Sequence, residues 1–307
     1  MSKKDIEVPL IPECSSCILN SLQTLLPLIA KNKEEQFELY RLAFKRLSEG
    51  YKKKTPPVEL SILLYRELYS LKGTENPLSE IKRLSIEAAR KALPWVDEQV
   101  LSKSGYDRLR AALAAAIAGN LIDYNTANYE PDLGGLRSSF TRIIEEGFAI
   151  DDSKQLWESL DSRTGLLTYL ADNAGETYLD MPFLRLAKEL GWTINFVVKG
   201  EAMVNDATEE DVEGSGIEEI AEVSNTGAWA LGVPKKWVSH QFLELIARSQ
   251  LVISKGQANV ETFPEIQSDF GVETYYVLKA KCPHIAEALN AKKGDNIVLR
   301  RPVDSES

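Results

Sequence analysis

Two acidic dipeptides, Asp172-Asn173 and Asn205-Asp206, provide the kind of oxygen atoms that bind hard metal ions. Each follows a short apolar run that predicts a β-strand, residues 166–171 for the first and 194–199 for the second. The carboxyl ends of parallel strands meet at the edge of a sheet where ligands bind. Carboxylate and amide oxygens suit Mg²⁺ or Mn²⁺ better than they suit soft metals. We therefore expect both dipeptides to face one metal-binding cleft.

A third segment has the residues of an anion-binding turn. The predicted strand 251–254 leads into Lys255-Gly256-Gln257-Ala258-Asn259. Lys255 can neutralise a phosphate, Gly256 lets the backbone approach an anion, and the start of a helix presents N–H groups that have no partner within the helix. Asn259 and Glu261 project from the same helix. A metal site beside such a turn indicates phosphate chemistry.

Each of these signals also has a simpler interpretation. Asp and Asn are favoured residues at helix N-caps, and Ala207-Thr208-Glu209-Glu210-Asp211 reads as an acidic first helical turn. The Lys255 segment alone fits an exposed turn. The recurrence of an Asp/Asn pair after two consecutive strands favours a shared site. Glu176, which follows Gly175, falls within reach of Asp172 in that arrangement.

The composition restricts the class of partner. The chain has 307 residues, a net charge of −10 and a pI near 5.0, which argues against nucleic acid as the main partner. A bound metal would supply local positive charge for a phosphorylated metabolite. No apolar stretch approaches the roughly 20 residues that a membrane span needs, and the first residues lack a signal peptide. We expect a cytoplasmic protein without a membrane partner, and leave its oligomeric state open.

The pattern along the chain predicts two parts. Residues 1–150 read as amphipathic helices, with apolar residues at alternating spacings of three and four. From about residue 162, short apolar runs alternate with amphipathic stretches, and runs at 251–254, 274–278 and 296–299 could complete a sheet. This alternation is typical of a three-layer α/β domain with a mainly parallel sheet. We therefore expect a helical domain at 1–150 and an α/β domain at 151–307, divided near Asp151-Asp152-Ser153.

The three cysteines form a separate candidate site. Cys14-x-x-Cys17 has the spacing of a metal clip or a redox pair, and Cys282-Pro283-His284 offers two further ligands. The odd number of cysteines does not suit a disulfide framework. Cys14, Cys17 and Cys282 thus predict either a second metal or redox site or three idle thiols.

The order of motifs resembles that of the damage-control phosphatases, a superfamily long labelled domain of unknown function 89. The resemblance lies in residues 170–176, 205–208 and 255–261, and supporting matches occur at Cys14-x-x-Cys17, Asn76-Pro77, Lys82, 118–123 and 279–283. It implies a helical domain joined to a Rossmann-like α/β domain, with a divalent metal held by Asp172, Asn173 and Asp206. The implied activity is hydrolysis of phosphate esters of sugars or of damaged metabolites. The cysteines are similar to those of the shorter microbial members.

These residues lead to a mechanistic hypothesis. A divalent cation (Mn²⁺, Mg²⁺, Co²⁺ or Ni²⁺) would polarise the phosphate, and Lys255 would stabilise negative charge opposite it. The attacking group is either water or Asp172, and Glu176 would orient the water or hold the metal ligands. We expect Asn120 and Asp123 to reach the substrate from the helical half.

The main alternative is a Rossmann-like protein that binds a nucleotide or metabolite without hydrolysing it. The fingerprint G-x-G-x-x-G after the first strand is absent, which weakens this alternative. A cofactor-dependent methyltransferase is a further α/β alternative, but it would not need the Lys255 segment. His240 and His284 are the only histidines, so a histidine-rich catalytic zinc site is excluded.

Overall fold

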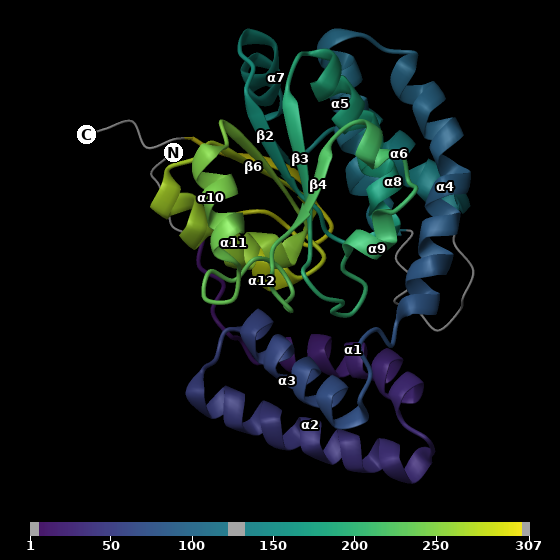
Figure 1. Ribbon diagram of the computed structural model, residues 1–307, viewed down its shortest axis with the longest axis vertical. Helices are drawn as coiled ribbons and strands as arrows, with labels where there is room; N and C mark the ends of the chain where they lie inside the picture. Colours follow the sequence, from purple (N-terminus) through teal and green to yellow (C-terminus); the bar gives the residue numbers. More distant parts are fainter. Residues whose placement is uncertain (1–5, 122–132, 303–307) are drawn as a thin grey trace.

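A mostly parallel β-sheet organises the fold, which we describe from a computed structural model covering residues 6–121 and 133–302. Across the described residues the sheet has seven strands in the order β1-β7-β6-β5-β2-β3-β4 (Figure 1). The strands are β1 (Ile150–Asp151), β2 (Leu166–Leu170), β3 (Thr193–Val198), β4 (Glu222–Asn225), β5 (Leu251–Lys255), β6 (Thr274–Lys279) and β7 (Asn296–Arg301).

The strand order places a topological switch point between β2 and β5. The chain runs outward from β2 through β3 to β4 and then returns to the other side of β2, where β5 and β6 follow. These five strands are parallel, whereas β7 pairs antiparallel with β6 and parallel with β1. The strand order therefore reverses between β2 and β5, and ligands of open α/β sheets bind at such a switch point.

Helices cover both faces of the sheet because side chains along each strand alternate between two apolar cores. In β2, Leu167 and Tyr169 contact one core and Leu170 contacts the other. Helices α7 and α8 pack in the first core, and α10, α11 and α12 pack in the second. Their bounds are α7 (Ser153–Ser162), α8 (Thr177–Glu189), α9 (Glu209–Val212), α10 (His240–Arg248), α11 (Gln257–Phe270) and α12 (Pro283–Ala288), with short 3₁₀ turns η2 (Ala174–Glu176) and η3 (Ile217–Glu219).

The helical half of the chain packs directly on this α/β part. Its elements are α1 (Cys14–Ile29), α2 (Lys33–Lys53), α3 (Pro57–Lys72), α4 (Ser79–Leu101), α5 (Gly105–Ala118), η1 (Gly119–Leu121) and α6 (Leu133–Glu146). Helix α5 is alanine-rich and buried along its length, and its small side chains allow close packing against α8 and α6. Helix α4 contacts α8 and η2, whereas α1, α2 and α3 form a separate layer (Figure 1).

The predicted α/β class with a mainly parallel sheet is confirmed. The predicted strands at 166–171, 194–199, 251–254, 274–278 and 296–299 correspond to β2, β3, β5, β6 and β7. Strands β1 and β4 were not predicted. The division into domains at residue 150 stays a prediction, and one apolar core extends from Ile18 in α1 to Val298 in β7. Within the described residues, none of the helices combines the length and the apolar character needed to cross a membrane.

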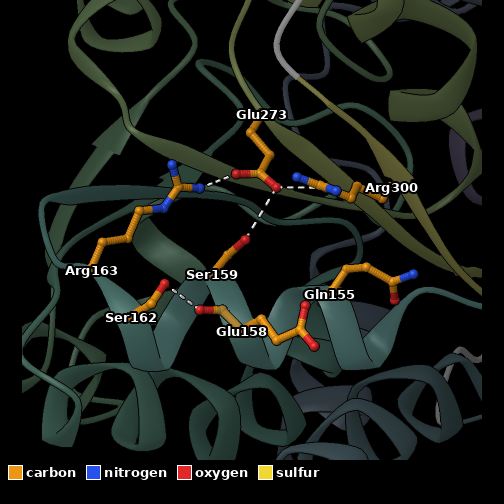
Figure 2. A pocket seen from close by; sticks show the side chains of 7 residues that line it. All are labelled: Gln155, Glu158, Ser159, Ser162, Arg163, Glu273 and Arg300. Atoms are coloured by element: carbon orange, nitrogen blue, oxygen red, sulfur yellow. Dashed lines mark hydrogen bonds and ion pairs between the residues drawn. The ribbon is translucent and has the colours of Figure 1, made fainter.

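A buried carboxylate, Glu273, lies at the end of the parallel strands that is opposite the switch point. Glu273, immediately before β6, is 3% exposed and forms ion pairs with Arg163 and Arg300, the latter through Nε at 2.7 Å (Figure 2). Ser159 and Tyr275 donate hydroxyl hydrogen bonds to Glu273 at 3.2 and 3.1 Å. Burial alone would raise the pKa of Glu273, but the Arg300 hydrogen bond and the Arg163 charge hold it below the ordinary value. A cavity of about 310 Å³ lies beside this cluster.

We predict that Glu273→Gln lowers the free energy of unfolding by about 1–3 kcal/mol near neutral pH, because two guanidinium groups lose their charged partner. A carboxylate with a depressed pKa stabilises the fold above its unfolded pKa of about 4.3, and this contribution is lost as the pH falls through its folded pKa. The difference between wild type and variant should therefore shrink below about pH 4. Urea unfolding of both proteins, near neutral pH and again below about pH 4, measures this difference in the free energy of unfolding. Glu158→Gln, an exposed change in the same cavity, is the control, and equal stability of all three proteins would contradict the prediction.

Candidate functional site

The first motif continues directly from β2 into a turn at the switch point. The Ala171 N–H donates to Val197 O at 2.9 Å, so pairing with β3 extends to the residue before Asp172. Asp172 and Asn173 are 9% and 8% exposed, and Glu176 is buried at the start of α8. Gly175 allows the turn to approach α4, since a Cβ there would lie 2.7 Å from the Ser85 Cβ.

The second motif returns to the first through the backbone. After β3 the chain loops out and back, so that the Ala174 N–H donates to Asn205 O and the Ala207 N–H donates to Asp172 O, each at 2.9 Å. These bonds form a short antiparallel bridge between Asn173 and Asp206. The two dipeptides, which are far apart in the sequence, are therefore hydrogen-bonded neighbours in the fold.

The carboxylates of the two motifs lie close together. Burial raises the pKa of Asp172 well above its ordinary value, and the negative charges of Glu176 and Asp206 raise it further. Asn173 lies between these groups, because its Nδ2 donates to Glu176 Oε1 at 2.7 Å and to Asp172 Oδ2 at 3.3 Å. The carbonyl oxygen of Asn173 is thus the atom of this amide suited to bind a cation.

The third motif brings Gly256 against Asp172. Gly256 has φ +81, and a Cβ at this position would lie 2.1 Å from Asp172 Oδ2. A side chain there would both strain the backbone and displace the carboxylate. Asn259, in the first turn of α11, donates to Ala171 O at 3.3 Å and to Lys255 O at 2.7 Å, which joins the third motif to the end of β2.

Lys255 is buried beneath the site instead of lining an open anion pocket. It is 0% exposed, and its Nζ donates to Ala116 O at 2.8 Å, Asp180 Oδ1 at 2.8 Å and Glu176 Oε2 at 3.1 Å. Ala116 belongs to the last turn of α5, where carbonyl groups lack helical partners and favour a cation. Burial would lower the pKa of Lys255, but the charges of Asp180 and Glu176 raise it above the ordinary value.

Sequence reasoning missed two buried charged residues at this site, Asp180 and Lys199. Asp180 lies one helical turn after Glu176 and shares Lys255 with it, and burial raises its pKa to about 6. Lys199, immediately after β3, donates to Ala171 O and Asn259 Oδ1 at 3.2 Å, and its Nζ lies 3.7 Å from Asp206 Oδ2. The four-residue spacing of Glu176 and Asp180 was a detectable signal.

The remaining predicted residues lie around this centre. Asn120, in η1, donates to Glu176 Oε2 at 2.9 Å, whereas Asp123 lies outside the described residues. Glu261 instead approaches the cysteines. Its carboxylate accepts a hydrogen bond from the Val58 backbone N–H. Burial is the largest cause of the raised pKa of Cys14 and Cys17, and the charge of Glu261 raises it further. Burial and the charges of Glu176 and Asp206 raise the pKa of Asp172, as described above. The exposed Lys281 lies close enough for its positive charge to oppose this increase.

The cysteine residues gather at one place in the fold. Cys14, Cys17 and Cys282 are free thiols, and Cys14 Sγ lies 3.9 Å from Nδ1 of the buried His284. Burial is the largest cause of the raised pKa of Cys17, and the charges of Cys282 and Cys14 raise this pKa further. A second metal or redox role for these thiols stays a prediction.

The donor set at the switch point fits a hard divalent cation. Four buried carboxylates (Asp172, Glu176, Asp180 and Asp206) face two buried lysines (Lys199 and Lys255), which leaves a net charge of −2 when all are ionised. Lys255 engages two of the carboxylates, so Asp172, Asp206 and the Asn173 carbonyl remain as oxygen donors. Residues 6–121 and 133–302 contain no cluster of three or more His, Cys, Asp or Glu side chains arranged to hold a metal. The third donor here is an amide.

A second cavity borders the loop that carries Asp206. Its volume is about 340 Å³, and the residues on its wall include Asn76 from the helical half and Ala202 and Thr208 from the loop. Its acidic lining consists of Glu75, Glu201, Glu209 and Glu210. The cavity wall is therefore rich in hydrogen-bond acceptors, and it contains none of Asp172, Asn173 and Asp206.

Comparison with known proteins gives a consistent result. The sequence matches the damage-control phosphatase ARMT1-like domain over residues 10–297. It is 32% identical to a damage-control phosphatase of Pyrococcus horikoshii, covering 94% of this chain and 96% of that protein, and 27% identical to a damage-control phosphatase of Archaeoglobus fulgidus, covering 93% and 97%. The crystal structure of a DUF89 family protein from P. horikoshii superposes with a TM-score of 0.83 at 31% identity, covering 95% of this chain and 99% of that one. The resemblance of the motifs is confirmed, and the chain belongs to the damage-control phosphatase ARMT1-like family.

Proposed function

We propose that this protein is a divalent-metal-dependent phosphatase that hydrolyses phosphate monoesters of small metabolites, such as sugar phosphates or damaged phosphometabolites. The observation that carries the proposal is the excess of buried carboxylates at the switch point, where Asp172 and Asp206 are neighbours. Buried charge is costly unless it is compensated, and a divalent cation compensates a net charge of −2. The names of the relatives support the reaction type.

Oxygen atoms of Asp172, Asn173 and Asp206 would hold the cation. When bound there, a divalent cation would supply positive charge that polarises the phosphate group. Asn120 and Asn173 both donate to Glu176, so its carboxylate has a fixed direction. We propose that Glu176 orients the attacking group, which is water or Asp172 itself.

The cationic partner of the phosphate is better supplied by Lys281 than by Lys255. Lys255 is enclosed by Ala116, Glu176 and Asp180, so we propose that it positions these carboxylates without touching the substrate. Lys281 is exposed and acts electrostatically on Asp172. The start of α11, at Gly256, would present backbone N–H groups to the same phosphate.

The cavity beside the loop that carries Asp206 would accept the part of the substrate that is not phosphate. Its carboxylates, including Glu201 and Glu209, favour hydroxyl or amine groups over a second anion. This supports a polyhydroxylated leaving group, in keeping with a sugar phosphate. The choice among Mn²⁺, Mg²⁺, Co²⁺ and Ni²⁺, and the cytoplasmic location, stay predictions from the sequence.

We predict that hydrolysis of a chromogenic phosphate monoester stops in EDTA and returns when Mn²⁺, Co²⁺, Ni²⁺ or Mg²⁺ is added. Asp206→Asn should lower the restored rate by more than about 100-fold, because even residues that only support metal ligands typically contribute 10–100-fold. Glu213→Gln, an exposed change seven residues later and outside the cavity lining, should leave the rate unchanged. Activity that is insensitive to EDTA, or a fully active Asp206→Asn protein, would contradict metal-dependent catalysis. The absence of hydrolysis with every metal would favour a protein that only binds its ligand.

A second prediction concerns Gly256. Gly256→Ala should lower the rate by more than about 100-fold, since the added methyl group overlaps Asp172 and displaces a proposed metal ligand. Gly214→Ala is a matched control, because Gly214 has φ +70 but no atom within 4 Å of the place that a Cβ would occupy. Both variants should lose about 1 kcal/mol of stability from backbone strain, measured by thermal unfolding. Equal activity of the two variants would show that the contact with Asp172 is unimportant.

A further inference from the structure

The loop that carries Asp206 contains a backbone conformation that its sequence disfavours. Val204 has φ +52, in the left-handed region that β-branched residues rarely adopt. Val204 lies within a turn that is closed by the hydrogen bond from the Asp206 N–H to Met203 O at 3.2 Å. The direction in which Asp206 leaves the loop therefore depends on Val204 keeping this conformation.

Tyr69, in α3 of the helical half, supports this turn. The Val204 N–H donates to the Tyr69 hydroxyl oxygen at 3.2 Å, and Tyr69 is 1% exposed. A buried N–H needs a partner, and the Tyr69 hydroxyl gives Val204 one that lies 135 residues away in the chain. Burial raises the pKa of Tyr69 to about 12, and the nearby charge of Asp206 adds to this, so the hydroxyl keeps its proton.

The same helix supports the beginning of the loop through Trp229. The indole Nε1 of Trp229 donates to Ala202 O at 2.9 Å. Arg66, one helical turn before Tyr69, donates through Nε to Trp229 O at 2.7 Å, and its guanidinium lies 5.6 Å from the Trp229 ring centroid. The Tyr69 and Trp229 rings pack at 6.1 Å. Helix α3 thus contacts both ends of the segment Ala202–Val204, once directly and once through Trp229.

We propose that Tyr69 is a positioning residue for Asp206: its hydroxyl holds Val204 in the left-handed conformation that directs Asp206 toward Asp172 and Asn173. Arg66 assists by fixing Trp229 against Ala202. This inference rests on the proposed function, in which Asp206 is a metal ligand. It makes α3, which contributes no donor to the metal, a determinant of metal affinity.

The test compares Tyr69→Phe with Tyr65→Phe. Both changes remove a buried hydroxyl from α3, but the Tyr65 hydroxyl bonds to Ser21 in α1 and not to the loop. Calorimetric titration of Mn²⁺ in the absence of substrate should show about tenfold weaker binding by Tyr69→Phe, the factor expected for one lost hydrogen bond. Tyr65→Phe should bind Mn²⁺ as the wild type does, whatever its effect on thermal stability.

Val204→Gly separates positioning from packing. Glycine adopts positive φ without strain, so Tyr69→Phe should weaken Mn²⁺ binding by less than about twofold in a Val204→Gly background. Equal Mn²⁺ affinity of Tyr69→Phe and Tyr65→Phe, or an undiminished effect in the Val204→Gly background, would overturn the positioning role. The variant Asp206→Asn separates a failure of the proposed metal site from a failure of the positioning role of Tyr69. If this variant binds Mn²⁺ as the wild type does, the proposed metal site fails and the positioning role fails with it, whereas loss of binding confined to Asp206→Asn overturns only the role of Tyr69.

Discussion

The site depends on an imbalance of charge that the fold keeps out of water. Asp172, Glu176, Asp180 and Asp206 are each less than one-tenth exposed, and Lys199 and Lys255 supply only two opposing charges. Repulsion among such groups would push the strand ends apart unless neighbouring atoms held them in place. The backbone bridge between Asn173 and Asp206, the amide of Asn259 and the carbonyl of Ala116 provide that restraint. The resulting geometry has a deficit of positive charge that suits a cation.

Both halves of the chain build this arrangement. Lys255 reaches from β5 to the end of α5, and Asn120 in η1 orients Glu176. Lys82 in α4 forms a buried ion pair with Asp211, whose carboxylate also accepts from the Thr208 backbone N–H at 2.8 Å. The loop with the second motif is therefore fixed from α4 at its end and from α3 in its middle. These polar contacts join halves that also share one apolar core.

Much of the α/β part could be predicted because its strands are short apolar runs with clear ends. Strands β2, β3 and β5 are recognisable in this way, and the polar residues after them mark the site. Strand β4 has the sequence Glu-Val-Ser-Asn, and β1 has two residues, so neither carries an apolar pattern.

The role of Lys255 could not be read from its neighbours in the chain. Its partners Ala116, Glu176 and Asp180 lie 139, 79 and 75 residues away and come from other helices. The same holds for Tyr69 and Val204, whose contact is set by tertiary packing. Local sequence indicates which residues carry polar atoms, but burial and partner choice depend on how distant elements meet.

The position of β7 has a consequence for biosynthesis. This strand, residues 296–301, lies between β1 and β6, so the sheet stays open at β6 until residues 296–301 have left the ribosome. An emerging chain would expose the unpaired edge of β6, which is the kind of surface that invites aggregation. The order of translation thus makes β7 the strand that joins β1 to the rest of the sheet, and a chain terminated before residue 296 would keep an uncovered β-edge at β6.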